Sequence, residues 1–435
     1  MAAGTLGVGG AGNRKLLQTK LAAKGLVYLQ NALGISSHVY QGHRDQFGKL
    51  HDGHAIGDTI SIPKPIRFVT NSGRVATNRQ GIVEENTSFT INRQEHVWIG
   101  ANAIEKTLNM PNFDDLVLKP AMQALAAKVD LSIHQALMRN TYFGSGTPGN
   151  ALATGGFNFA RAAMMKVAVP MDDGNICAVI DPFDMASLEG EMKTFFHERL
   201  VQTAVQGNYN SPLATITPLE AAQAVTHTVG SHGGTPLVAG ANQSGNSLNI
   251  DGGTNSTTGF LRRGDTFTIA GVFEVNIDTL ESTGRLQRFV VTADVSTSGS
   301  GAATVPIEPE MNDGTLTTVD GEGNPVSKAA YQTVSALPAD NAAITVIGNA
   351  DTEYRRVGLF HKNAVTFASV PIQVPANDPN SVTVTHPETG ISITVSGDFN
   401  ILEMRDDTRF DVLWGAKLID PRLSHVIWTR EALAA

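Results

Sequence analysis

The stretch FLRRGDTFTIAGVFEV, residues 260–275, combines two signals. It contains Arg263-Gly264-Asp265, the tripeptide that cell-adhesion receptors read on extracellular proteins. It also alternates between apolar and polar side chains, as a β-strand does after a Gly-Asp turn. A tripeptide of common residue types often arises by chance. We therefore interpret this one as the turn that begins a strand. Its apolar positions are Phe267, Ile269, Val272 and Val275.

The sequence around this stretch indicates a small all-β module. Residues from about 229 to 352 are mostly Gly, Ser, Thr, Asn and Val, a composition typical of strands joined by many turns. The candidate strands are 266–276, 288–295, 302–308 and 343–348. Because sequences of mixed α and β character lie on both sides, we predict that the module is an insertion.

The composition describes a chain with folded cores. Of its 435 residues, 41% are hydrophobic, which excludes general disorder, and only 17% are charged. One cysteine, Cys177, excludes an internal disulfide framework and a cysteine-based zinc site, and its apolar surroundings predict that it is buried. We find no apolar run long enough to cross a membrane and no secretory signal, so we expect no membrane association and little use for an adhesion tripeptide.

The first 44 residues carry five basic residues and no acid, so the rest of the chain has a net charge of −14 against −9 for the whole. Such a segment can be an organelle transit peptide, a nucleic-acid arm, an arm that docks an acidic protein, or a solvated helix face. The apolar spacing over residues 16–33 predicts a helix in it. The negative charge elsewhere disfavours nucleic-acid readout.

Strand-like runs at 57–69 and 87–100 flank a polar tip and predict a long β-hairpin that serves as an arm. Apolar residues every three or four positions predict a long spine helix over 114–141. The next section mixes helices at 158–169 and 185–205 with a buried strand at 176–181 and strand and turn structure at 213–225. Closing strands are expected at 364–374, 381–386, 391–400 and 411–428.

Each candidate motif for catalysis or cofactor binding lacks the companion residues that its chemistry requires. His51 and His54, with His38 and His43 nearby, lack the cysteine or carboxylate companions of a metal site. Asp320 begins an apparent calcium loop, but Pro325 stands where that loop needs glycine. We therefore expect no enzyme activity, no cofactor and no metal.

The order of basic arm, hairpin, spine helix, α/β section, inserted β-module and closing strands resembles the major capsid proteins of tailed bacteriophages, with the α+β Hong Kong 97 fold. The segments RRGDTFTIAGV, AATVPIEPEM, VGLFHKNAVTFASVPIQVPAN and FDVLWGAKLIDPRLSHVIW are similar to coat proteins of the Salmonella phage P22 type. In that family a small β-barrel, the I-domain, interrupts the A-domain. The resemblance implies an N-terminal arm at 1–40, an E-loop hairpin region at 41–100, a P-domain with the spine helix at 101–170, a first part of the A-domain at 171–228, the I-domain at 229–352 and a return through the A- and P-domains at 353–435.

The resemblance also implies a function. The chain is expected to self-assemble, as hexameric and pentameric capsomers, into an icosahedral head shell that encloses double-stranded DNA without sequence-specific binding. Expected partners are a scaffolding protein and a portal, with room for a decoration protein. Assembly is expected in the bacterial cytoplasm and the final location in the virion. The alternative is a tail or fibre component, although the short repeats typical of fibres are not found.

The hairpin carries charges of both signs that neighbouring copies could contact. These candidate assembly residues are Arg67, Arg74, Arg79, Glu84 and Glu85. On the N-terminal arm, the candidates for docking an internal partner are Arg14, Lys15, Lys20 and Lys24. In the family a long loop before the barrel strand reaches a neighbouring capsomer. The matching stretch here, 240–260, looks shorter and carries one acid and no base, so a salt-bridged contact across capsomers is not expected from it. The tip of the E-loop or a partner protein is expected to make that contact instead.

Overall fold

A computed structural model describes residues 10–47, 50–51, 54–55, 58–70, 74, 82–102, 114–171, 173–192, 213–319, 325–374, 378, 380–387 and 389–432. Two units can be distinguished, and each combines segments that are far apart in the sequence. Unit 1 contains Met1–Ser61, Ser88–Ile133 and Thr366–Lys417. Unit 2 contains Ile62–Thr87, His134–Val365 and Leu418–Ala435.

The main sheet of unit 1 is built on one long strand, β22 (Arg405–Leu418). Strand β5 (Arg93–Asn102) pairs antiparallel with β22 along its whole length, and β21 (Ser392–Asn400) pairs on the other side. Strand β20 (Ser381–Thr385) continues the sheet next to β21, and β19 (Val365–Ser369) lies beside β22. Three expected closing strands are therefore present, although 411–428 is divided.

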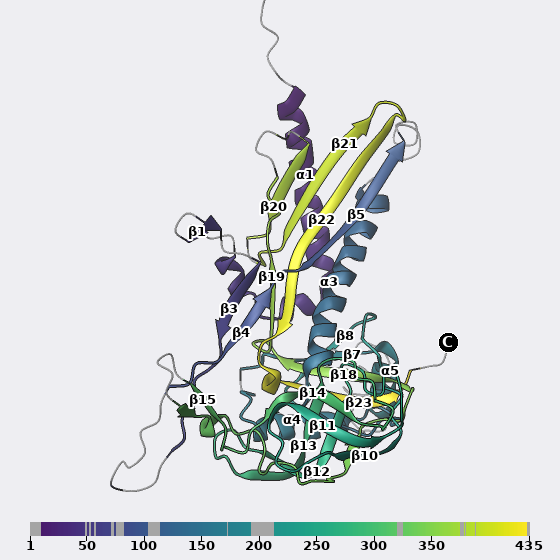
Figure 1. The fold of residues 1–435 in the computed structure, drawn as a ribbon. Coiled ribbons are helices and arrows are strands. Elements are labelled where there is room, and N and C mark those ends of the chain that lie inside the picture. Colours follow the sequence, from purple (N-terminus) through teal and green to yellow (C-terminus); the bar gives the residue numbers. More distant parts are fainter. Residues whose placement is uncertain are drawn as a thin grey trace, which may run out of the picture. The chain divides into compact units, whose positions relative to one another are not determined.

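Two helices pack in unit 1. Helix α1 (Gly10–Ala32) runs along β20 and β21 (Figure 1) and buries Leu26 and Leu29. Helix α3 (Lys119–Asn140) follows a π-helical turn, η3 (Asp114–Leu118), so the predicted spine helix is confirmed. The indole Nε1 of Trp414 donates a hydrogen bond of 2.9 Å to Ser132 Oγ, which ties α3 to β22.

The segment after α1 is held by a buried carboxylate. The segment after α1 forms the 3₁₀ turns η1 (Ile35–His38) and η2 (Gly42–Gln46). The backbone N–H groups of Gly34 and Ser36 donate to the Asp130 carboxylate at 2.8 and 3.1 Å. These N–H groups lie at the start of η1, where a helical turn leaves its donors without partners, so Asp130 caps the turn. Residue 130 thus fixes the exit of α1 against α3.

The hairpin is shorter than predicted. Strand β3 (Thr59–Pro63) pairs with β4 (Asn86–Thr90), and the chain then leaves the hairpin because residues 93–102 join β22 as β5. Gly415 permits this departure, since a Cβ there would lie 2.4 Å from the carbonyl oxygen of Thr90. The short strands β1 (Leu50–His51) and β2 (His54–Ala55) form a separate pair.

The central sheet of unit 2 has the order β6 (Gly144–Ser145), β23 (Ser424–Glu431), β18 (Glu353–His361), β7 (Ile176–Ile180) and β8 (Thr217–Glu220), with β9 (His227–Thr228) also paired to β18. All five residues of β7 are buried, as the predicted strand at 176–181 requires, and Cys177 is among them. Burial raises the pKa of the Cys177 thiol to about 11, so the thiol is inert.

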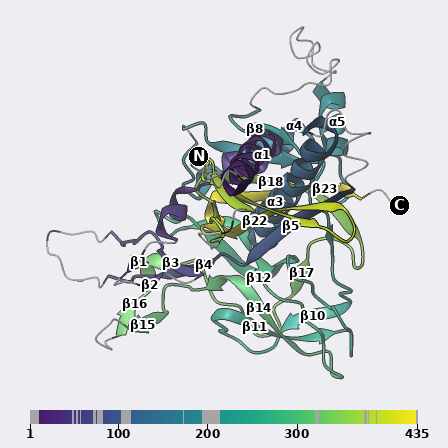
Figure 2. The ribbon, with the colours of Figure 1, turned by 90° about the horizontal axis from the view of Figure 1, so that it is seen from above.

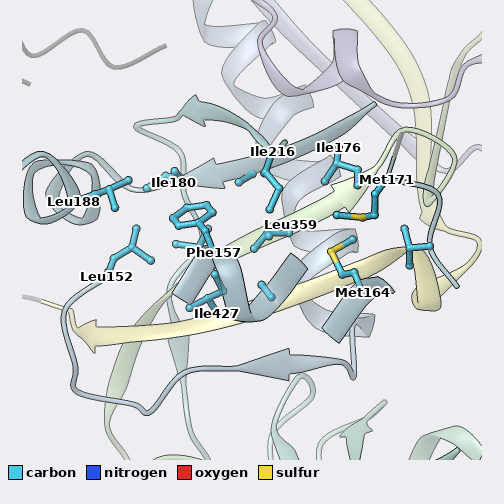
Figure 3. Packing of buried hydrophobic residues seen from close by; sticks show 14 of the residues in the cluster. Leu152, Phe157, Met164, Met171, Ile176, Ile180, Leu188, Ile216, Leu359 and Ile427 are labelled. Atoms are coloured by element: carbon cyan, nitrogen blue, oxygen red, sulfur yellow. The ribbon is translucent and has the colours of Figure 1, made fainter. Parts of the chain in front are cut away.

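Helices α4 (Thr154–Lys166) and α5 (Pro182–Met192) pack against this sheet. Figure 3 shows Phe157 and Met164 of α4 and Leu188 of α5 facing Ile180 and Leu359 of the strands. The predicted helix at 158–169 begins four residues earlier than expected. The predicted helix at 185–205 is confirmed as far as Met192, and its remainder lies outside the described residues.

A second sheet of unit 2 closes into a small barrel. Its order is β10 (Gly234–Val238), β11 (Gly245–Gly253), β14 (Ala303–Met311), β13 (Ser282–Val291), β12 (Thr266–Val275) and β17 (Ile344–Val346). A bridge between Leu237 and Ala343 joins the first and last strands. Figure 2 shows most of these strands grouped together. Their inner face buries apolar side chains such as Leu248, Phe267 and Phe289. The α+β class with an inserted β-barrel is confirmed.

Two expectations in unit 2 need correction. The stretch 240–260, expected to be a shortened loop, contains strand β11 at 245–253, which buries Leu248 and Ile250 in the barrel. The closing run 411–428 is two strands, because Asp420 caps the 3₁₀ turn η5 (Pro421–Leu423) that separates β22 from β23. Proline lacks the N–H that a continuous ladder would need. Beside the barrel, β15 (Thr317–Val319) and β16 (Pro325–Ser327) form a small hairpin, followed by the 3₁₀ turn η4 (Ala329–Tyr331).

Candidate assembly surfaces and the barrel junction

The turn at Arg263-Gly264-Asp265 begins barrel strand β12, as predicted. Gly264 has a φ of +96°, a conformation that glycine adopts without strain. Asp265 is 0% exposed, so its carboxylate is not displayed to a receptor. The Arg263 side chain donates to Asn140 Oδ1 at 3.3 Å. The tripeptide is a structural turn.

The Asp265 carboxylate is the centre of a buried polar junction. One oxygen accepts hydrogen bonds from the backbone N–H groups of Arg262 at 2.7 Å and Gly230 at 3.0 Å. The other accepts from His227 Nε2 at 2.6 Å. The buried Arg356 of β18 donates to the carbonyl of Gly264 at 3.2 Å. The carboxylate thus joins the chain that enters the barrel, the first barrel turn and the central sheet.

Burial sets the charges in this junction. It lowers the pKa of Arg356 to about 9, although the Asp265 charge opposes the shift, so the guanidinium stays charged at neutral pH. Burial and the charge of Arg356 lower the pKa of His227 to about 4, so the imidazole is neutral. Arg356 also lies over the Trp428 ring, 5.1 Å from its centroid. Asp265 is therefore the anion that balances a buried cation.

A second polar cluster holds the base of the hairpin in unit 2. Lys328 Nζ lies 2.7 Å from a Glu85 carboxylate oxygen and 2.5 Å from one of Glu310, and Lys64 lies 3.3 Å from Glu85. Tyr331 Oη donates to the carbonyl of Val83 at 2.9 Å. Burial alone would raise the pKa of Glu85, but Lys328 and Lys64 outweigh burial and lower it. The hairpin base is thus fastened to the segment that follows β16.

The predicted assembly residues fall into two groups. Arg67 and Glu85 lie half-buried at the hairpin base, whereas Arg74 and Glu84 are exposed. Arg79 lies outside the described residues. On the predicted docking arm, Lys20 and Lys24 are exposed on α1, and Arg14 and Lys15 lie on the same helix, where their side chains are outside the described part.

Several residues of these sites could not be found from sequence. His227, Arg356, Lys328 and Tyr331 occupy no recognisable motif, and their partners are distant in the chain. The loop between β21 and β22 was also missed. There Ile401, Leu402 and Met404 are 78%, 96% and 55% exposed. The apolar sequence at a hairpin turn was an available signal, because contiguous exposed apolar side chains mark interaction surfaces.

No group of His, Cys, Asp or Glu among the described residues is arranged to hold a metal ion. Of the histidines considered above, His43 stacks edge-on against Tyr40. None of the helices in the described ranges is long and apolar enough to cross a membrane.

We predict that Asp265→Ala destabilises the chain strongly. The variant leaves Arg356 as an uncompensated buried charge and two backbone donors without an acceptor, at a cost of about 3–5 kcal/mol. Asp294→Ala is the matched control, since Asp294 accepts one exposed hydrogen bond from the N–H of Arg263 in the same turn, worth about 1 kcal/mol. Urea unfolding of the unassembled chain measures both. Equal losses would contradict the role given to Asp265.

We predict that stability falls as the pH falls from about 6.5 towards 4. Burial holds the pKa of His134 and His227 at about 4 and that of His425 at about 3, all below the unfolded value of 6.5. The unfolded chain therefore binds protons first over this range, and each histidine contributes a slope of up to about 1.4 kcal/mol per pH unit. Urea unfolding at a series of pH values measures the slope. His425→Gln should reduce it, and an unchanged slope would contradict the assignment.

Comparison with known proteins supports the resemblance seen in the sequence. The model of the family described as P22 coat protein, gene protein 5, matches residues 54–426. No curated protein matches the chain. Among solved structures, the chain is similar to that of Mycobacterium phage Che8, with 10% identity over 91% of this chain and 90% of that chain and a TM-score of 0.45.

Two other solved structures are similar to parts or most of the chain. The capsid of Ralstonia phage GP4 shows 9% identity over 87% of this chain and 85% of that chain, with a TM-score of 0.44. The CUS-3 coat protein I-domain shows 26% identity over 27% of this chain and 96% of that chain, with a TM-score of 0.18. The family match is the comparison on which function can rest.

Proposed function

The chain belongs to the P22 coat protein family, and from this premise we propose how it builds a shell. It is a major capsid protein of a tailed bacteriophage, a structural component of the virion whose copies assemble into a multi-subunit shell. We propose that the copies form hexameric and pentameric capsomers of an icosahedral head. The single observation that carries this proposal is the family match over residues 54–426.

The domain division follows from the same premise. The barrel closed by Leu237 and Ala343 is the I-domain, with bounds at 229–352. Segments 1–40, 41–100 and 101–170 are the N-terminal arm, the E-loop region and the P-domain. The A-domain occupies 171–228, and 353–435 returns through both the A- and P-domains.

Contacts between copies use several modest surfaces. A shell repeats each contact many times, so no single contact needs to be strong. Arg74 and Glu84 are exposed on the hairpin and are the first candidates for charged contacts, together with Arg79. Arg67 and Glu85 act at the hairpin base, where Glu85 already pairs within its own chain. The exposed apolar loop at Ile401, Leu402 and Met404 offers an additional surface to a neighbouring copy.

The charge distribution supports a shell that encloses DNA without binding it tightly. Outside the first 44 residues the chain carries a net charge of −14, and a basic lining would bind packaged DNA tightly. The DNA is thus enclosed without sequence-specific binding. The basic segment of α1 docks a scaffolding protein through Arg14, Lys15, Lys20 and Lys24. A portal occupies one vertex, a decoration protein has room outside, and assembly takes place in the host cytoplasm.

Sedimentation velocity with negative-stain imaging tests the capsid proposal. We expect closed shells, or hexameric and pentameric capsomers, when the chain is expressed alone or with the genes beside its own. Such assemblies follow if the exposed surfaces bind other copies. A stable monomer or trimer under both conditions would contradict the proposal and favour a tail or fibre role.

We predict that the double variant Lys20→Gln, Lys24→Gln slows partner-dependent assembly roughly tenfold, because it removes two charges each worth up to about 0.7 kcal/mol at an exposed contact. The control is Lys119→Gln, Lys128→Gln, which removes two exposed charges from α3 of the same unit. Light scattering on mixing with a purified scaffolding protein measures the rate. Equal slowing in both variants would point to net charge alone and exclude a docking arm.

A further inference from the structure

A cavity of about 370 Å³ lies in unit 2 beside the fastened hairpin base. Its wall combines the hairpin base, the residues that follow α3, barrel strands β13 and β14, and the turn η5. Lys64 stands at its rim and is 41% exposed, so the cavity reaches the surface. The volume is enough for a small organic group together with a few waters, since one water occupies roughly 30 Å³ in the liquid.

Most charges on the wall of this cavity already have partners. Lys64 and Lys328 pair with Glu85 and Glu310. Arg422 pairs with Asp420 through Nε at 2.8 Å and Nη2 at 2.5 Å. These wall residues therefore form ion pairs rather than a patch of uncompensated positive or negative charge.

Arg67 is the exception. Its guanidinium has neither an ion pair nor a hydrogen bond to any residue in the described ranges. It lies over the ring of Tyr331, 5.6 Å from the centroid, and this contact holds it in place. Burial and the neighbouring Arg422 lower the pKa of Arg67, although the charge of Asp420 opposes the shift. Its planar set of N–H donors is available to a ligand.

Tyr142 supplies a second unused donor on the same wall. Its side chain is only 7% exposed, and its hydroxyl makes no hydrogen bond within the part of the chain that the structure describes. Burial and the charge of Asp420 raise the pKa of the phenol, so the hydroxyl keeps its proton. Buried polar groups are normally hydrogen-bonded. An acceptor in the cavity would satisfy both Tyr142 and Arg67.

We propose that this cavity binds a carboxylate group through Arg67 and Tyr142. A guanidinium presents parallel donors that match the two oxygens of a planar carboxylate. The wall also contains Glu85, Glu308, Glu310 and Asp420, which would repel a doubly charged phosphate more than a singly charged carboxylate. The group can come from a free organic acid or from an acidic side chain of a second copy. Only the second source depends on the capsid proposal.

Arginine modification by phenylglyoxal, mapped by mass spectrometry of peptides, tests this proposal on the full chain. Acetate is the probe for free carboxylates, because it carries a single negative charge, with sodium chloride at matched ionic strength as its control. We expect saturating acetate to slow modification of Arg67 in unassembled subunits by about tenfold or more, as a hydrogen bond to a charged group implies. Modification of Arg74, which is exposed on the same hairpin, should not change.

The Tyr142→Phe variant and assembled shells separate the two sources. If the carboxylate comes from a neighbouring copy, assembly without acetate protects Arg67, and Tyr142→Phe weakens that protection. If it is a free acid, acetate protects subunits and Tyr142→Phe weakens the effect. No protection in either state, or protection on assembly that Tyr142→Phe leaves intact, would overturn the proposal. Sedimentation on the same samples shows whether shells formed, so a failure to assemble is not confused with a failure to bind.

Discussion

The constraint on which unit 2 depends is the burial of one carboxylate, that of Asp265. A buried anion is tolerated only when hydrogen bonds and a nearby cation compensate it. The N–H groups of Arg262 and Gly230, the ring of His227 and the charge of Arg356 meet that requirement. Because these groups come from segments on both sides of the barrel entry, satisfying the carboxylate fixes where the barrel begins against the central sheet. The inserted domain is thereby anchored by electrostatics as well as by its own apolar core.

The same logic of satisfied charges shapes the hairpin. Its base is fastened by Lys328, Glu85, Glu310 and Tyr331, whereas Arg74 and Glu84 remain exposed. We propose that a coat protein uses this division. The base gives the hairpin a defined direction, and the exposed part meets neighbouring copies through contacts weak enough to correct errors. Residues next to the barrel in unit 2 therefore help to fix the position of the hairpin base.

Local patterns predicted much of the fold. The apolar period over 114–141 was strong enough to place α3, and the Gly-Asp turn before Phe267 placed β12. Strand β11 was missed because only Leu248 and Ile250 point inward among Asn, Ser and Gly residues of low β propensity. The predicted hairpin is longer than the observed one, because the alternation of apolar and polar residues indicates a strand at 93–102 but does not indicate which strand it pairs with.

The candidate sites were harder to predict than the elements. Charge on the hairpin was visible, but that Glu85 would pair with Lys328 and that Arg67 would stack on Tyr331 depends on tertiary folding. The sequence predicted that Asp265 belongs to a turn, but not that its carboxylate is buried and hydrogen-bonded to other segments. The spacing of His227 and Arg356 does not indicate that both lie near Asp265, because residues so far apart in the sequence leave no periodic signal.

Amide hydrogen exchange on the Asp265→Asn variant tests the central claim most directly. The substitution keeps the shape of the side chain and removes its charge. If Asp265 anchors the barrel to the central sheet, protection should fall together at 227–230, at the start of β12 and in β18 around Arg356. Loss confined to the turn at 262–266, with β18 and 227–230 protected as before, would contradict the account.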